Sequence, residues 1–279
     1  MLIGLMTLIA AAAAAGLALG CNGFEGFGWL WQLPVGFLGA FLAQLILLFL
    51  GMIVMTWFVK MDEVQEKDSK FFRFVIHEVI VLLITLLGIK IDTEGLEKLP
   101  GDKRVMVVCN HLNDTDPVVL LHYFKKYELA FISKRENDKK FLIGPFLRAI
   151  LCQPINREND WEALRTILHC IDLLKRDEVS IAVFPEGYTS MDGLLHPFRP
   201  GVFKIAMKTK VPVVVCTLRD TQTIFPNILR LRGSRISLHV LDVIRPEQYE
   251  GMTAVELSDM AHKIMADDLG PELVLQENT

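Results

Sequence analysis

The distribution of hydrophobic and polar residues divides the chain into an apolar N-terminal part and a mixed remainder. The first 59 residues contain a single charged side chain, Glu25. Two apolar runs, residues 1–20 and 35–59, are each long enough to cross a bilayer as a helix, which takes about 20 residues. We therefore expect a membrane hairpin of two helices over residues 1–60.

The charges around the second run predict the orientation of this hairpin. Four basic residues follow it: Lys60, Lys67, Lys70 and Arg73. The linker between the runs has no lysine or arginine, and basic residues favour the cytoplasmic side. We expect the remainder of the chain in the cytoplasm, at the inner membrane of a bacterial cell. A signal peptide over residues 1–20 is an alternative, although a basic start is missing there.

A third apolar stretch covers residues 71–87, and Arg73, His77 and Glu78 interrupt its first half. Its uninterrupted part is too short to cross a bilayer alone. We interpret residues 61–90 as an interfacial amphipathic helix that lies on the membrane. A third membrane span is the alternative.

From residue 89 onwards, short runs rich in valine and isoleucine alternate with helical periodicity. Strands are expected at residues 104–109, 129–133, 151–155, 180–184, 211–217 and 236–243. Helices are expected at residues 117–126, 139–149, 161–175, 202–208 and 254–267, with Asp160 as the cap of the third. This alternation predicts an α/β domain over residues 91–279, with a mixed, partly parallel sheet flanked by helices.

Composition supports membrane contact and excludes several other classes. The chain is 52% hydrophobic, with a mean hydropathy of +0.36 and a net charge of −4. Such hydropathy is high for a soluble domain, and the acidic balance gives no reason to expect nucleic acid as a partner. The chain has five cysteines and no Cys-x-x-Cys pair. We expect buried reduced thiols and no metal site.

One histidine stands where catalysis is expected. His111 follows the apolar run 104–109, and Asp116 directly precedes Pro117, a residue suited to the first position of a helix. Asp116 is therefore expected to cap that helix. A turn of this length also allows the Asp116 carboxylate to orient the His111 ring and leave its other nitrogen as a base. Taken alone, the motif is better explained by a helix cap and a surface histidine.

Further candidates for ligand binding follow the later strands. They are Arg157, Glu186, Gly187, Thr189, Arg199 and Lys204. The guanidinium of Arg157 suits a phosphate group, and Gly187 permits a sharp turn and a close approach to a ligand. Arg199 and Lys204 surround an expected helix start, where anions are favoured. Each of these residues also has an ordinary structural explanation as a turn or surface residue.

Together, the order and spacing of these segments resemble the glycerolipid acyltransferase family, which includes the 1-acylglycerol-3-phosphate acyltransferases. The similar segments are residues 111–116 (HxxxxD), 153–157 (the second block, ending in arginine), 184–187 (FPEG) and 211–213 (the fourth block). The resemblance covers about residues 89–243. Asn113 stands where the family often has serine, and Tyr188-Thr189-Ser190 replaces a common Thr-Arg-Ser.

The resemblance implies a membrane-bound acyltransferase of phospholipid synthesis. A fatty acyl group would move from a thioester, acyl-CoA or acyl carrier protein, to the sn-2 hydroxyl of lysophosphatidic acid, giving phosphatidic acid. His111 would act as general base and Asp116 would orient it. Arg157 would bind the acceptor phosphate, and Glu186 with Gly187 would shape the acceptor pocket. The expected partners are a membrane lipid acceptor, the thioester donor and the bilayer, with no further cofactor.

Three alternatives remain at this stage. One is an acyltransferase or transacylase with another lysolipid acceptor. The second is a lipid hydrolase, which would need a protein nucleophile beside His111. The third is a membrane-anchored scaffold without catalysis.

Overall fold

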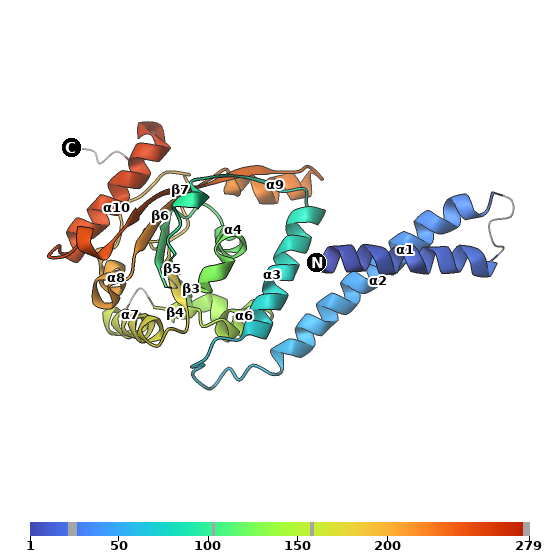
Figure 1. Ribbon diagram of the computed structural model, residues 1–279, viewed down its shortest axis with the longest axis horizontal. Helices are drawn as coiled ribbons and strands as arrows, with labels where there is room; N and C mark the ends of the chain where they lie inside the picture. The colour runs from blue at the N-terminus through green and yellow to red at the C-terminus, as the bar shows by residue number, and fades with distance from the viewer. Residues whose placement is uncertain (22–26, 102–103, 157–158, 276–279) are drawn as a thin grey trace. The chain divides into compact units, whose positions relative to one another are not determined.

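The computed structural model describes residues 1–21, 27–101, 104–156 and 159–275, which are drawn in colour in Figure 1. Arg157, a candidate phosphate ligand, lies outside the described residues. The chain forms two compact units, Met1–Asp62 and Glu63–Thr279.

The first unit contains α1 (Leu2–Cys21) and α2 (Trp29–Thr56). Small residues of α1 at helical spacing, Ala10, Ala14 and Ala18, are buried. A side chain at Gly36 of α2 would begin 3.1 Å from the Ala14 Cα atom, so glycine permits this close approach of the helices. Both helices are long and apolar enough to cross a membrane. The hydropathy pattern therefore predicted two apolar helices correctly, and they suggest membrane association.

The second unit is built on a seven-stranded sheet with the order β1-β7-β6-β2-β5-β3-β4. Its strands are β1 (Lys90–Glu94), β2 (Met106–Cys109), β3 (Leu129–Lys134), β4 (Gln153–Ile155), β5 (Ser180–Val183), β6 (Val213–Arg219) and β7 (Arg235–Ile244). All neighbouring strands are parallel except β6 and β7. This confirms the mixed, mostly parallel sheet. The central strands β2 and β5 are buried along their whole length because helices cover both faces.

Helices pack on both faces of this sheet. They are α3 (Lys70–Leu86), α4 (Asp116–Tyr123), α5 (Arg135–Asp138), α6 (Ile143–Ala149), α7 (Asp160–Lys175), α8 (Lys204–Thr209), α9 (Ile224–Leu229) and α10 (Ala254–Leu269). In Figure 1, α3, α4 and α6 lie on one side of the central strands, and α7, α8 and α10 lie on the other. A buried core joins the second group to alternate residues of the strands, among them Met106 and Val108 of β2. The fold thus follows from strands whose two faces are both apolar.

The helix α3 belongs to the second unit, where it contacts α4 and α6. Phe72, Ile80 and Leu82 are buried, whereas Phe71 and Phe74 are 62% and 47% exposed. The helix therefore has one apolar face on the body and further apolar side chains outside it. This packing within a folded body argues against a third membrane span.

Several local expectations differ from the structure. The strand β1 was not expected, because its sequence Lys-Ile-Asp-Thr-Glu is largely polar and exposed. The cap of α7 is Asn159, whose side chain accepts hydrogen bonds from Trp161 and Glu162, and Asp160 is already the first helical residue. Four cysteines are buried as free thiols, whereas Cys21 is exposed on α1.

Candidate active site

The candidate site forms where β2, β5 and β6 reach their carboxyl ends. These strands are parallel neighbours, so their exit loops meet at one edge of the sheet. Asn110, directly after β2, is buried, and its side chain bonds both ways with the Leu218 backbone, donating at 2.9 Å and accepting at 2.8 Å. The amide thus extends the pairing of β2 with β6 by one residue. This fixes the direction in which the next residue, His111, leaves the sheet.

His111 and Asp116 form a hydrogen-bonded pair. The Nδ1 atom of His111 lies 2.9 Å from Oδ2 of Asp116, whose side chain is fully buried. The same oxygen accepts hydrogen bonds from the backbone N–H groups of Leu112 and Asn113, at 2.6 and 2.8 Å. Asp116 therefore holds the loop as well as the ring. A proton on Nδ1 is favoured by this carboxylate, and the lone pair is then left on Nε2.

The expected capping role of Asp116 is wrong. Helix α4 begins at Asp116 itself, with Thr115 before it and no side-chain cap. The carboxylate is instead turned back into the loop, where three donors surround one oxygen. Asp116 is placed by being the first residue of α4, and its carboxylate binds the preceding loop instead of capping the helix.

The loop after β5 closes over His111. The carbonyl oxygen of His111 accepts a hydrogen bond from the Ser190 N–H at 2.8 Å, and its own N–H donates to Glu186 at 2.9 Å. The Phe184 ring stacks on the His111 ring, with centroids 4.1 Å apart. The histidine is thus held through its backbone on two sides and through one face of its ring.

Glu186 lies inside the protein. Its side chain is 1% exposed, and its two oxygens accept hydrogen bonds from the backbone N–H groups of His111 and His196, at 2.9 and 3.0 Å. These hydrogen bonds show that Glu186 supports the histidine loop, whereas its predicted role in shaping an acceptor pocket stays a prediction. Burial raises the pKa of Glu186 to about 7, although both backbone hydrogen bonds oppose the rise.

Thr189 completes a line of three side chains. Its hydroxyl lies 3.1 Å from Nε2 of His111, on the opposite side of the ring from Asp116. With the proton on Nδ1, the hydroxyl donates to the Nε2 lone pair. An oxygen bound at this position is placed to lose its proton to the histidine.

Gly187 and Arg199 lie against each other. Gly187 has a φ of +86°, and a side chain there would begin 2.8 Å from Nε of Arg199. The Arg199 N–H donates to the Pro185 carbonyl at 2.8 Å, which ties this segment to the start of the loop. The exposed Arg199 side chain therefore occupies space that only glycine leaves open.

The structure brings together His111, Asp116, Glu186 and Thr189, with Arg199 beside Gly187. Lys204 starts α8 with an exposed side chain and has no hydrogen bond or ion pair to these residues within the described part of the chain. Sequence reasoning missed three supporting residues: Asn110, Phe184 as the stacking partner, and His196. Asn110 follows an apolar run and directly precedes His111, and Phe184 is the first residue of the FPEG segment, so these positions were the available signal. Among the described residues, no group of three or more metal-ligating side chains is placed to hold a metal ion.

Comparison with known proteins gives consistent matches. The acyltransferase family model matches residues 90–219. A chloroplastic 1-acyl-sn-glycerol-3-phosphate acyltransferase of Brassica napus is 36% identical over 155 residues, which are 54% of this chain and 44% of the relative. A 1-acyl-sn-glycerol-3-phosphate acyltransferase of Cocos nucifera is 28% identical over 189 residues, 67% of this chain and 60% of the relative. The chain thus spans about half the length of these relatives.

One solved structure shares the fold. The crystal structure of the 1-acyl-sn-glycerophosphate (LPA) acyltransferase PlsC from Thermotoga maritima superposes with a TM-score of 0.61 at 22% identity. The match covers 85% of this chain and 94% of the PlsC chain. It therefore extends well beyond the residues that the family model matches.

Proposed function

On the strength of the match to the acyltransferase family over residues 90–219, we propose that the chain is an acyltransferase and transfers a fatty acyl group to the sn-2 hydroxyl of lysophosphatidic acid. The names of the similar proteins support this acceptor. The observation that carries the proposal is the His111–Asp116 pair, in which Nε2 of His111 lies 3.1 Å from the Thr189 hydroxyl. Such a pair is suited to activating an alcohol.

The proposed reaction needs no covalent intermediate on the protein. The acceptor hydroxyl takes the place of the Thr189 hydroxyl and loses its proton to Nε2 of His111 as its oxygen attacks the thioester carbonyl. The C–O bond forms, the C–S bond breaks, and the proton passes from His111 to the departing thiolate. Asp116 stabilises the imidazolium that exists between these two proton transfers. Acyl-CoA and acyl carrier protein are both suitable donors.

The acceptor phosphate is proposed to bind beside the Gly187 turn. Arg199 has an exposed guanidinium there, and no carboxylate partner is seen among the described residues. Arg157 is a second proposed ligand. Lys204 is proposed to add long-range attraction for the anionic acceptor, since it is exposed at the start of α8.

The same proposal accounts for the apolar helices. A lysolipid acceptor resides in a bilayer, so an enzyme that uses it has to work at the membrane surface. We propose that residues 1–60 form a membrane hairpin, with α3 at the interface and residues 91–279 as a cytoplasmic catalytic domain at an inner membrane. Support comes from two helices of sufficient length and apolar character and from the basic residues after the second.

Thr189 favours a second candidate function, hydrolysis of the thioester. Its hydroxyl, the His111 ring and the Asp116 carboxylate stand in the order nucleophile, base and orienting acid. Thr189 would attack the thioester carbonyl, form an acyl ester with release of the thiol, and water would then free the fatty acid. This arrangement supplies the nucleophile that the sequence did not reveal.

One experiment tests both candidates. Purified full-length protein in detergent receives radiolabelled lysophosphatidic acid with acyl-CoA or, separately, acyl carrier protein thioester, alongside His111→Ala, Thr189→Val and Thr189→Ser. We expect phosphatidic acid from the wild type, a loss of about a thousandfold in His111→Ala, and continued transfer in Thr189→Val. Transfer lost in Thr189→Val but kept in Thr189→Ser would contradict direct attack. Free fatty acid without phosphatidic acid would replace the transferase proposal by the hydrolase.

A further inference from the structure

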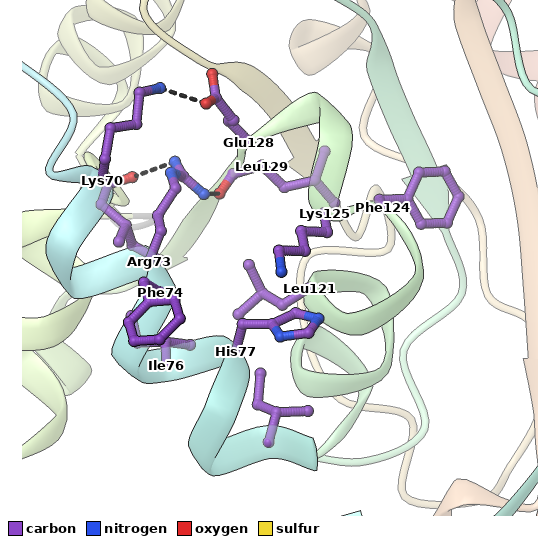
Figure 2. A pocket seen from close by; sticks show the side chains of 12 residues that line it. Lys70, Arg73, Phe74, Ile76, His77, Leu121, Phe124, Lys125, Glu128 and Leu129 are labelled. Carbon is purple, nitrogen blue, oxygen red and sulfur yellow. Dashed lines mark hydrogen bonds and ion pairs between the residues drawn. The ribbon is translucent and has the colours of Figure 1, made fainter. Parts of the chain in front are cut away.

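A cavity of about 190 Å³ lies between α3 and the carboxyl end of α4, away from the candidate active site (Figure 2). Its lining includes Leu129, the first residue of β3, whereas His111 lies two residues after the end of β2 at Cys109. Both strands are parallel to β5, so the two places lie at opposite edges of the sheet. The cavity is therefore a separate feature from the catalytic loops.

The lining of the cavity is amphipathic. Its apolar part consists of Phe74, Ile76, Ile80, Leu121, Phe124 and Ile150. Its polar rim carries three basic side chains and an imidazole, with Glu128 as the acid. An apolar floor beneath a cationic rim suits a molecule with an anionic head and an apolar tail.

Most charges at this rim are already neutralised. Lys70 pairs with Glu128 and lies 3.2 Å from Asp68, and the Arg73 guanidinium lies 2.6 Å from Asp68. Arg73 also donates to the Leu129 carbonyl at 2.8 Å. Figure 2 draws the ion pair between Lys70 and Glu128 and the hydrogen bond from Arg73 to the Leu129 carbonyl. They leave little cationic capacity for a ligand on this side of the cavity.

Lys125 is different. No carboxylate partner for its ammonium is seen in the part of the chain that the structure describes, and Figure 2 shows the ammonium directed toward the His77 ring. His77 stacks on His122, with ring centroids 5.5 Å apart. Burial, and then the charge of Lys125, lower the pKa of both histidines. A lysine beside two neutral imidazoles is a positive charge without compensation.

The two histidines also have unused polar atoms. The Nδ1 atoms of His77 and His122 are buried and form no hydrogen bond with any described residue. The nearest acid to the first of them is Glu78, with an oxygen 4.0 Å away. Buried polar atoms without partners are uncommon in folded proteins and call for an explanation such as a bound group.

The position of the cavity points to lipid. It opens beside α3, where Phe71 and Phe74 are 62% and 47% exposed. Exposed aromatic residues next to basic ones favour the head-group region of a membrane. The volume is smaller than the roughly 300 to 1,000 Å³ of sites for drug-sized ligands, so only part of a lipid fits.

From these observations we infer that the cavity binds an anionic phospholipid, with its phosphate at Lys125 and the first carbons of its chain over Phe74, Ile80 and Leu121. Lys125 donates to the phosphate oxygens, and the imidazole of His77, which lines the cavity and stacks on His122, faces the same region. The inference does not rest on the proposed reaction. It describes a second lipid site, which would hold the second unit at a membrane surface that carries anionic lipid.

The test uses purified full-length protein in maltoside detergent. It is titrated with dioctanoylphosphatidylglycerol, which is anionic, with dioctanoylphosphatidylcholine, which is zwitterionic, and with inorganic phosphate. Bound lipid per chain is counted by native mass spectrometry, and the thermal unfolding temperature is followed in parallel. We expect phosphatidylglycerol alone to bind saturably and raise the unfolding temperature.

Three variants locate the bound lipid. Lys125→Gln should weaken phosphatidylglycerol binding about tenfold, the loss of one charge-assisted hydrogen bond, and Lys125→Arg should retain it. The matched control is Lys126→Gln, since Lys126 donates to the Pro100 carbonyl at 3.2 Å and does not line the cavity. Binding that Lys125→Gln leaves unchanged would place the lipid elsewhere, including the catalytic site, and overturn the inference. Equal binding of both lipids, or full competition by inorganic phosphate, would also overturn it.

Discussion

Histidines near the two ends of α4 stand in opposite circumstances. In the loop before α4, His111 has a carboxylate on one ring nitrogen, a hydroxyl on the other and Phe184 against its face. At the end of α4, His122 stacks on His77 of α3, and each has a buried nitrogen without a hydrogen bond to any described residue. The first ring is fixed in one orientation and one tautomer. The second pair is not fixed by any such partner.

The contrast shows what a histidine needs to act as a base. It needs a lone pair aimed at the substrate and a negative charge to stabilise the imidazolium. His111 has both. His77 and His122 have a positive neighbour instead, because the charge of Lys125 adds to burial in lowering the pKa of each. Their surroundings oppose taking up a proton and favour an anion, which is the basis for separating the proposed catalytic site from the proposed lipid site.

The largest effect is expected from removing the carboxylate that distinguishes the first site. Asp116→Asn removes the negative charge of the carboxylate, on whose Oδ2 atom three donors converge. The amide can also donate to Nδ1 and thereby favour the wrong tautomer. We expect kcat for acyl transfer to fall about a thousandfold with little change in KM.

The matched control for this variant is Asp114→Asn. Asp114 is an exposed acid in the same loop, so its replacement removes the same charge without touching the histidine. We expect less than a twofold change in kcat. Equal losses in the two variants would mean that the net charge of the loop matters, and not the orientation of His111.

The His111–Asp116 pair could be predicted from sequence because its two members are five residues apart in the chain. The support of that pair could not. Thr189 and Glu186 reach His111 across 78 and 75 residues, and such contacts depend on β2 and β5 being neighbours in the sheet. The alternation of strands and helices predicted the sheet but not its order. The strand β1 was missed because it lies at the edge of the sheet, where exposed polar residues replace the apolar run.

A smaller effect, opposite in sign at the two sites, is expected from pH. Burial raises the pKa of Glu186 from 4.5 to about 7, so the folded chain holds this proton more tightly than the unfolded chain. Stability should therefore fall as the pH rises between about 4.5 and about 7, by roughly 3 kcal/mol in total.

At the cavity, the pKa of Glu128 is shifted in the opposite direction. Burial raises this pKa, but the hydrogen bonds from Lys70 and Arg104 lower it by more, so the net shift is downward. Its contribution should be lost as the pH falls below 4.5.

Thermal unfolding of the full chain in detergent, measured from pH 4 to pH 8, separates these contributions. Glu186→Gln should make the unfolding temperature less dependent on pH above about pH 4.5. Glu128→Gln should make it less dependent on pH below that value. A wild-type slope above pH 4.5 that survives in Glu186→Gln would assign the titration to another group. The same variant also tests the support of the His111 loop, because an amide accepts only one of the two backbone N–H groups that the carboxylate accepts.

The smallest effect concerns the basic side chain that each site carries, Arg199 at the first and Lys125 at the second. Gly187→Ala and Gly193→Ala place the same methyl group at positions with φ of +86° and +78°, and each should cost about 1 kcal/mol in backbone strain. Only at Gly187 does the new atom meet a neighbour, 2.8 Å from Nε of Arg199, because nothing lies within 4 Å at Gly193. Arg199 then has to move. We expect KM for the lysophosphatidic acid acceptor to rise about tenfold in Gly187→Ala, with kcat and phosphatidylglycerol binding unchanged. In Gly193→Ala we expect none of these three quantities to change. Equal KM values in the two variants would remove Arg199 from the acceptor site and leave the phosphate to other basic residues.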